Sequence, residues 1–216
     1  MSPQAARLHA ALPQTQCTRC GYPDCAGYAQ AIADGAAAIN QCPPGDAFRA
    51  ARLAALTGQS ALPLNPVNGA EAPRAVAVID ESWCIGCTLC LEVCPTDAIL
   101  GANKYMHTVI EHYCTGCELC LPVCPVDCIA LDNVTGSRTG WQAWSQMQAD
   151  EALRRYQDRR SRLERDAREQ ADRLEGKNQA RPAGLPGQPQ GKPADRKKSM
   201  IEAALALARK RKGPGA

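Results

Sequence analysis

Hydrophobic and polar positions follow a period of two in the segment Arg74–Asp80, where valines recur at alternate positions as in a short half-buried strand. About thirty residues later, the stretch His107–Ile110 occupies the corresponding place. An isoleucine also lies at a matching position in each half, at Ile99 and Ile129. This internal repeat predicts two small antiparallel ribbons with helices between them.

Three other stretches have helical character. Residues 26–39 are rich in alanine and carry bulky apolar side chains at helical spacing. Residues 141–175 contain acid-first pairs at i,i+4 beside an apolar stripe that is too narrow for a globular core. That stripe suits a partner groove or a short coiled coil, and a solvated single helix fits equally well. Residues 194–212 have an apolar centre between two basic clusters, which predicts a basic amphipathic helix.

The cysteines indicate metal binding. Eight of the thirteen form two copies of the run CxxCxxCxxxCP. Three closely spaced thiolates on one turning loop can bind three irons of a cube, and the fourth cysteine of each run in such ferredoxins ligates the other [4Fe-4S] cluster. Iron is expected rather than zinc, because no histidine lies inside either run and no long spacer divides the ligands into pairs. The predicted ligands are Cys84, Cys87, Cys90 and Cys124 for one cluster, and Cys114, Cys117, Cys120 and Cys94 for its neighbour.

Four more cysteines lie upstream of these runs. Gly21 and Pro23 bend the first of their loops, so that the thiols can converge. Taken alone, the set suits either a zinc site or a cluster, and the neighbouring ferredoxin pattern favours a cluster. A disulfide framework is disfavoured, because the chain opens without an apolar export signal and thirteen cysteines then indicate a reducing compartment. The four residues are Cys17, Cys20, Cys25 and Cys42.

The order of these motifs is more specific than either motif alone. QTQCTRCGYPDCAGYAQAI and INQCPPG precede CIGCTLCLEVCP and CTGCELCLPVCP, and in this order they resemble the B subunit of the bacterial Rnf (Rsx) type electron transport complex over roughly residues 14–132. The resemblance implies a third [4Fe-4S] cluster on the four upstream cysteines. It also implies an electron-transfer protein that works within a membrane-associated, ion-translocating oxidoreductase, with membrane-bound Rnf-like subunits as redox partners and no small-molecule turnover of its own.

One departure from that family concerns the membrane. Its members commonly begin with an apolar anchor, whereas here sixteen residues precede Cys17 and no segment approaches the roughly 20 apolar residues of a spanning helix. We therefore expect a soluble form without the N-terminal anchor, held at the membrane by partners or by charge. The expected location is the cytoplasm, peripheral on the cytoplasmic face of the inner membrane.

Charge is unevenly distributed. Residues 1–138 contain 7 Lys and Arg against 12 Asp and Glu, whereas residues 139–216 contain 18 against 10. An acidic redox half suits basic docking sites on partner proteins. The basic tail could contact an anionic membrane surface or a partner, and nucleic acid is disfavoured because no aromatic residues interleave with the basic ones.

These patterns predict an α+β chain of small domains organised by metal, in which cluster ligation supplies folding energy. A small helical four-Cys iron-sulfur domain precedes a dicluster ferredoxin-like domain and a helical or disordered basic tail. The expected boundaries are 1–56 for the four-Cys domain, 57–73 for a linker, 74–135 for the ferredoxin-type domain, 136–176 for the charged helix, 177–193 for a flexible spacer and 194–216 for the tail.

A few residues remain outside the three cysteine sets. Cys128 is predicted to be a small buried apolar residue rather than a ligand. Trp83 and Tyr113 precede equivalent cysteines and are expected to shield the clusters from solvent. His112 could hydrogen-bond a cluster, but a surface position is the commoner outcome, and the other two histidines are isolated.

No nucleotide-binding loop or nucleophile elbow is present in the sequence. An electron-transfer subunit is therefore the leading interpretation. Two alternatives remain: a soluble ferredoxin that serves a different reductase, and a redox-sensing regulatory or scaffold protein that uses its basic tail to bind a partner.

Overall fold

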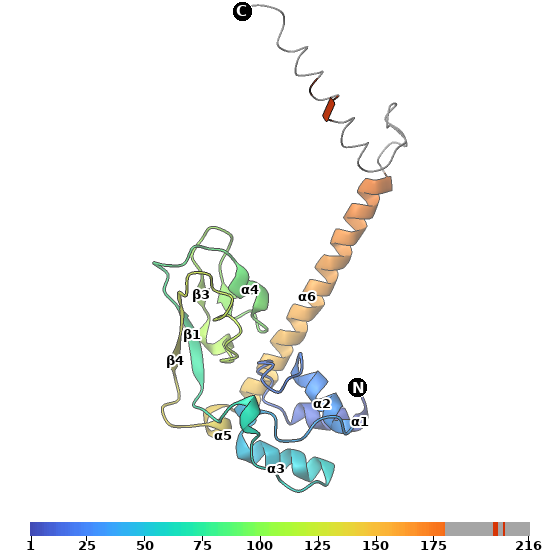
Figure 1. Cartoon of the computed structure of the whole chain (residues 1–216), viewed down its shortest axis with the longest axis vertical. Helices are drawn as coiled ribbons and strands as arrows, with labels where there is room; N and C mark the ends of the chain where they lie inside the picture. Colours follow the sequence, from blue (N-terminus) through green and yellow to red (C-terminus); the bar gives the residue numbers. More distant parts are fainter. Residues whose placement is uncertain (180–200, 203–204, 206–216) are drawn as a thin grey trace, which may run out of the picture. The chain divides into compact units, whose positions relative to one another are not determined.

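The computed structural model describes residues 1–179, 201–202 and 205, and the chain forms two compact units, Met1–Glu164 and Arg165–Ala216 (Figure 1). Of the predicted spacer and basic tail, 177–216, only residues 177–179, 201–202 and 205 are described. Among the described residues, no helix is both long enough and apolar enough to cross a bilayer. The mixed helix and small-sheet organisation predicted from the sequence is confirmed.

The four-Cys region consists of α1 (Pro3–Ala10), α2 (Cys25–Ala33), η1 (Pro43–Gly45) and α3 (Asp46–Thr57). Ser2 and Asp24 cap the first two helices, because their side chains accept hydrogen bonds from the N–H groups of Ala5 and Gly27. The helix expected to continue to residue 39 ends at Ala33 instead, since Gly35 adopts a left-handed φ of 73° and closes the helix. The apolar core of this region contains Leu8, Leu12, Tyr28, Ile32, Ile39 and Leu53.

The ferredoxin-like region is built from two short antiparallel ribbons. Strand β1 (Ala75–Ile79) pairs with β4 (Ile129–Asn133), and β2 (Ile99–Leu100) pairs with β3 (Thr108–Val109). Helix α4 (Leu89–Val93) and η3 (Glu111–Tyr113) lie between the strands. The two ribbons predicted from the repeat are therefore confirmed, and each one joins a strand from the first half to a strand from the second.

The core of this region contains few bulky side chains. Four of its nine buried members are cysteines, and two are alanines. A core of this kind buries little aliphatic surface for its size, so metal ligation must contribute much of the folding free energy.

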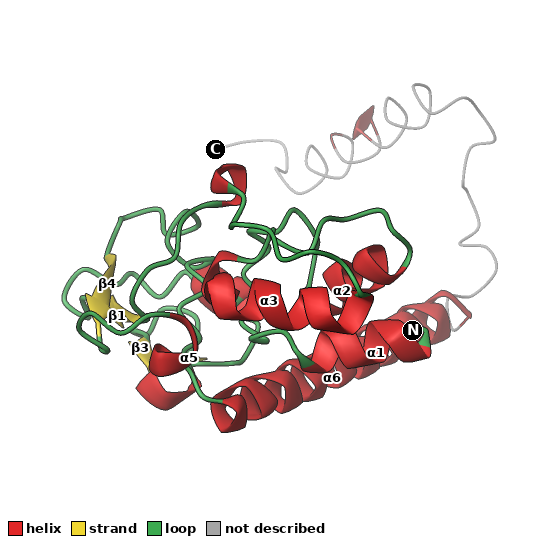
Figure 2. Ribbon diagram, turned by 90° about the horizontal axis from the view of Figure 1, so that it is seen from below, coloured by secondary structure: helices red, strands yellow, loops and turns green. Residues whose placement is uncertain are grey.

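A C-terminal segment joins the two regions inside the first unit. It contains α5 (Gly140–Ala143) and the beginning of α6 (Gln146–Gln179), visible as the long helix in Figures 1 and 2. Trp144 and Ala149 are buried, and the hydroxyl of Tyr156 donates a hydrogen bond to Asp24. The first part of the stripe, expected to face an external partner or water, thus packs against this chain itself at Leu153 and Tyr156, whereas Leu163 is already 48% exposed.

The segment predicted as a linker, 57–73, is held against the four-Cys region. It contains η2 (Pro66–Asn68), and its Asn65 N–H donates to the carbonyl of Asn40 at 2.9 Å. Asn68 Nδ2 donates to the carbonyl of Arg19 at 2.9 Å. The link is therefore fixed at several points along its length.

Candidate iron-sulfur sites

Eight cysteines of the ferredoxin-like region line two separate cavities. One cavity is bordered by Cys84, Cys87, Cys90 and Cys124, together with apolar side chains such as Ile79 and Ile129. The second is bordered by Cys94, Cys114, Cys117 and Cys120. Each cavity thus gathers three thiols from one run and one from the other run. We call them the first and second ferredoxin sites.

Strand pairing produces this exchange of the fourth cysteine. Strand β1 precedes the first run and pairs with β4, which follows the second run, so the end of the second run returns to the start of the first. The junctions are equivalent: Asp80 N–H donates to the Cys128 carbonyl at 2.8 Å, and Ile110 N–H donates to the Ala98 carbonyl at 2.7 Å. The antiparallel register therefore dictates which thiols meet.

Backbone conformation turns each run around its cavity. Gly86 and Gly116 have φ angles of 69° and 66°, and a Cβ atom at either position would collide with the backbone of the strand or loop opposite. Thr88 and Glu118, at matching places, also adopt left-handed φ angles of 67° and 65°. The repetition of such uncommon backbone angles identifies the two loops as copies of one cysteine-bearing turn.

Main-chain N–H groups point at cysteine sulfurs in both sites. The His107 N–H donates to Cys84 Sγ at 3.3 Å, and the equivalent Ala77 N–H donates to Cys114 Sγ at 3.4 Å. Ala98 N–H donates to Cys94 Sγ at 3.2 Å. These donors suit thiolate sulfur, which accepts hydrogen bonds when it carries negative charge.

The four upstream cysteines form a third group, held by loops around α2. Cys25 and Cys42 are buried, while Cys17 and Cys20 are half-buried. The buried Gln16 accepts the Cys25 N–H at 2.8 Å, and Gly21 takes a φ of 85°, as a bend at that position requires. The loop thus presents its thiols toward the start of α2.

Burial raises the pKa of at least one thiol in each of the three groups, including that of Cys90 to about 11 in the first ferredoxin site, whereas at Cys124 the effect of burial is outweighed by backbone hydrogen bonds, which lower its pKa. Burial raises the pKa of Cys25 to about 12, with further contributions from the neighbouring Cys17 and Cys20. Burial likewise raises the pKa of Cys117 and Cys120 to about 12, and that of Cys42 well above its usual range. Thiols this close would repel one another as free thiolates, so bound iron is the natural compensating positive charge, and binding it releases their protons. The donor chemistry therefore fits iron-sulfur clusters.

Among the residues that the structure describes, no group of three or more His, Cys, Asp or Glu side chains is arranged to hold a metal ion.

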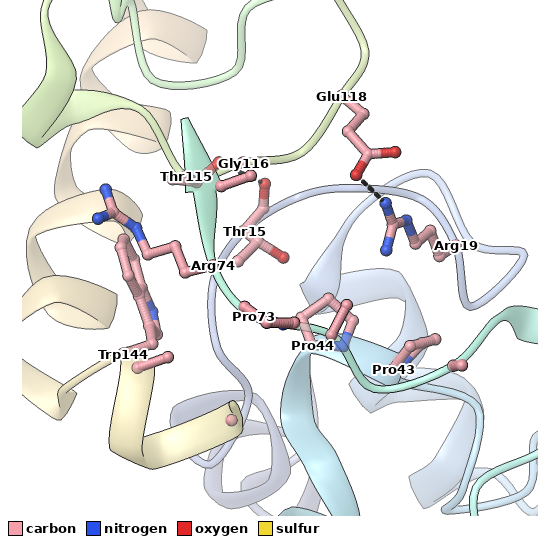
Figure 3. Close-up of a pocket in the computed structure, with 15 residues that line it drawn as sticks. Thr15, Arg19, Pro43, Pro44, Pro73, Arg74, Thr115, Gly116, Glu118 and Trp144 are labelled. Carbon is pink, nitrogen blue, oxygen red and sulfur yellow. Dashed lines mark hydrogen bonds and ion pairs between the residues drawn. The ribbon is translucent and has the colours of Figure 1, made fainter. Parts of the chain in front are cut away.

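The four-Cys region meets the ferredoxin-like region at the second ferredoxin site (Figure 3). Thr115 Oγ1 donates to the carbonyl of Thr15 at 3.1 Å, and Arg19 forms an ion pair with Glu118 at 2.5 Å. Arg19 also lies within electrostatic range of the thiols of Cys17 and Cys117. The cavity between the two regions encloses about 80 Å³, well below the roughly 300–1,000 Å³ of small-molecule sites.

The sequence analysis missed the sulfur contacts of two neighbours of the first ferredoxin site, because it took His107 as isolated and Cys128 only as a small buried apolar residue. His107 is only 1% exposed, and its Nδ1 lies 3.4 Å from Cys90 Sγ. Cys128 is half-buried in the core, as a small apolar residue would be, but its Sγ also lies 3.5 Å from Cys124 Sγ. Alignment of the two repeats could have singled out both residues, since they stand opposite alanines.

The expectation that Trp83 shields a cluster from solvent is wrong. Its side chain is 69% exposed and points away from the core, so it does not shield a cluster. Tyr113 is partly buried against the core, with the Arg155 guanidinium over its ring. The two equivalent positions therefore differ, because only Tyr113 lies under α6.

Comparison with known proteins relates both cysteine-bearing regions to iron-sulfur families. A family model described as a 4Fe-4S dicluster domain matches residues 77–131, and a second model, for an Fe-S cluster, matches residues 12–44. Among curated proteins, the chain is 58% identical over 140 residues to the B subunit of the ion-translocating oxidoreductase complex of Azoarcus sp., covering 65% of this chain and 76% of that protein. It is 53% identical over 155 residues to the protein of the same name from Alkalilimnicola ehrlichii, covering 71% and 82%. No solved structure matches the chain.

Proposed function

The chain belongs to the family formed by the B subunits of ion-translocating oxidoreductase complexes, and from that premise we propose that it relays electrons through three [4Fe-4S] clusters within such a complex. A [4Fe-4S] cluster supplies reversible one-electron transfer when bound. The protein's own contribution is to hold the clusters apart from water at fixed positions and to donate hydrogen bonds to their ligand sulfurs.

The proposed ligand sets follow the three groups of thiols. They are Cys17, Cys20, Cys25 and Cys42; Cys84, Cys87, Cys90 and Cys124; and Cys94, Cys114, Cys117 and Cys120. The observation that carries the proposal is the grouping of three thiols from one run with one thiol from the other around each ferredoxin cavity. Two independent mononuclear sites would need no such exchange.

The junction between the regions suggests an order of transfer. Thr15 and Thr115 are joined by a hydrogen bond. Thr15 lies two residues before Cys17, a proposed ligand of the four-Cys cluster, and Thr115 directly follows Cys114, a proposed ligand of the second ferredoxin site. The four-Cys cluster therefore exchanges electrons with the second ferredoxin site, which in turn exchanges them with the first. The partners at the two ends are redox subunits of the complex, on the cytoplasmic face of a membrane.

Iron and acid-labile sulfide counting on the anaerobically purified chain tests the proposal. Three clusters require about twelve of each per chain, with EPR signals of interacting reduced centres after dithionite treatment. Cys42→Ala should remove about four irons, whereas the matched variant Cys128→Ala should retain all of them. About eight irons with zinc retained in the unmodified chain would refute the third cluster.

A test of partnership uses the membrane subunits of the source organism's complex. The loaded chain should co-purify with them and be reduced or reoxidised by them on the time scale of turnover. A chain that loads fully but neither binds nor exchanges electrons with these subunits would contradict membership in a working complex and favour a separate soluble ferredoxin.

A further inference from the structure

The two halves of the ferredoxin-like region are related by an offset of thirty residues. The offset superposes Cys84 on Cys114 and Cys94 on Cys124, and it also pairs Asp97 with Asp127, both at a φ of 50°. With so close a repeat of backbone angles and hydrogen bonds, a difference in side chains stands out. Ala77 corresponds to His107, and Ala98 corresponds to Cys128.

Both differences place the more polar side chain of the pair at the first ferredoxin site. His107 and Cys128 border the cavity of the first ferredoxin site, whereas Ala77 and Ala98 border that of the second. Backbone donors are matched, since both His107 and Ala77 direct a main-chain N–H at a ligand sulfur. At these two positions only the first site has side chains that can donate to sulfur, while elsewhere the second site has Thr96 and Thr115 where the first has Val126 and Ile85.

The imidazole of His107 is held in one orientation. It is almost completely buried, Nδ1 lies 3.4 Å from Cys90 Sγ, and Nε2 has no hydrogen-bond partner among the described residues. A Cβ atom at Gly101 would collide with its Cδ2, so glycine at that position makes room for the ring. An iron-bound thiolate has no proton to give, so Nδ1 must carry the hydrogen and donate it to the sulfur.

Cys128 is placed similarly toward the fourth ligand. Its Sγ lies 3.5 Å from Cys124 Sγ, which is a sulfur hydrogen-bond distance and far beyond the length of a disulfide. When Cys124 binds iron as a thiolate, the proton of the pair belongs to Cys128, so its S–H donates. Two of the four ligand sulfurs in the first site therefore receive a side-chain donor as well as any backbone donors.

We propose that His107 and Cys128 stabilise the reduced form of the cluster in the first ferredoxin site and so raise its reduction potential above the value that the alanines of the second site would give. This inference rests on the proposed function, because it takes Cys90 and Cys124 as cluster ligands. One electron enters from a reductant, dithionite or the neighbouring cluster, and no proton moves. The added charge strengthens both hydrogen bonds, since donors near cluster sulfurs stabilise the more negative state.

Anaerobic redox titration of the loaded full-length chain, followed by EPR, tests the proposal. His107→Ala and Cys128→Ala should each shift one of the two ferredoxin couples to a more negative potential, and the double variant should shift it further. A tenfold change in the one-electron equilibrium corresponds to about 59 mV. His107→Asn, whose amide can donate from a similar position, should restore part of the shift, and the matched control His112→Ala should leave both couples in place.

The reciprocal variant identifies the site. Ala98→Cys installs the thiol beside Cys94 and should move the other couple to a more positive potential. Unchanged couples in correctly loaded His107 and Cys128 variants, or a shift of the same couple by Cys128→Ala and Ala98→Cys, would overturn the inference. A chain that fails to bind about eight irons in its ferredoxin region would instead refute the proposed function.

Discussion

Replacing Trp144 by alanine should destabilise the cluster-loaded protein by about 4 kcal/mol. Trp144 is 7% exposed, its Nε1 donates to the carbonyl of Pro13 at 2.9 Å, and the Arg74 guanidinium lies over its ring. The side chain therefore fixes the start of α6 to both iron-sulfur regions. Its loss should loosen the contact between them.

The magnitude follows from the area that Trp144 removes from water. A buried tryptophan covers about 150–250 Å², which at about 25 cal/mol per Å² is worth about 4–6 kcal/mol. Partial burial in the unfolded chain reduces this to about 3–5 kcal/mol. Trp144→Phe keeps most of the ring and loses mainly the hydrogen bond to Pro13, so it should cost only about 1–2 kcal/mol.

Guanidinium unfolding of the anaerobic, loaded protein, followed by far-ultraviolet circular dichroism, measures the effect. With a slope of about 4 kcal/mol per molar denaturant, Trp144→Ala should lower the midpoint by about 1 M. The exposed Trp83→Ala is the matched control and should leave the midpoint nearly unchanged. Equal midpoints for Trp144→Ala and Trp83→Ala would refute the conclusion that this part of the chain is docked through Trp144.

Three further predictions concern other positions. Arg159→Ala should lower the free energy of unfolding by about 3 kcal/mol, because the buried guanidinium donates to the carbonyls at the end of α4, and these would lose their partner. Gly116→Ala should reduce cluster loading as well as stability, because its left-handed φ and its contact with β1 both exclude a Cβ atom. Burial lowers the pKa of His9, so the unfolded chain takes up a proton more readily than the folded one. Stability should therefore be complete above about pH 6.5 and fall as the pH drops toward 5, and His9→Gln should flatten that decline.

Each of these three predictions has its own control or its own result that would contradict it. Arg165→Ala, on the exposed part of α6, should change the free energy of unfolding by less than about 0.5 kcal/mol, and a comparable loss in both arginine variants would contradict the docking of Arg159. Gly136 has a φ of 61° but open space around it, so Gly136→Ala should cost only about 1 kcal/mol and leave iron content intact. If unfolding midpoints of the unmodified chain are the same at pH 5 and pH 7, the account of His9 is wrong.

The metal-binding chemistry of this protein follows from residues that lie close together in its sequence. The spacing within each cysteine run is short enough for one loop to present its thiols together, so the ligand types and the kind of cofactor can be read without a structure. The strand patterns before and after each run are also local, since alternating valines need only one buried face. Those elements were predicted at nearly their observed positions, whereas the helix after Cys25 was predicted too long because the turn at Gly35 competes with alanine-rich helical propensity.

Other features depend on segments that are distant in sequence. Periodicity could not place α6, because its narrow apolar stripe fits solvent or an external partner as well as this chain. Tertiary packing decides the matter through Trp144 and Arg159, which find partners 131 and 67 residues away. The exposure of Trp83 and the burial of Tyr113 follow from the same docking, since Arg155 of α6 covers the ring of Tyr113 and Trp83 remains 69% exposed.

The sequence by itself determined which thiols this protein offers and how many groups they form, because ligand spacing is a property of a single loop. The tertiary structure alone decided what surrounds each thiol. Antiparallel pairing of β2 with β3 brings His107 beside Cys90, which is 17 residues away, and the folded turn after Cys124 places the Cys128 thiol beside it, while alanines stand at the matching places of the second site. Two nearly identical cysteine runs thereby acquire different electrostatic environments, because hydrogen bonds and burial act through space rather than along the chain.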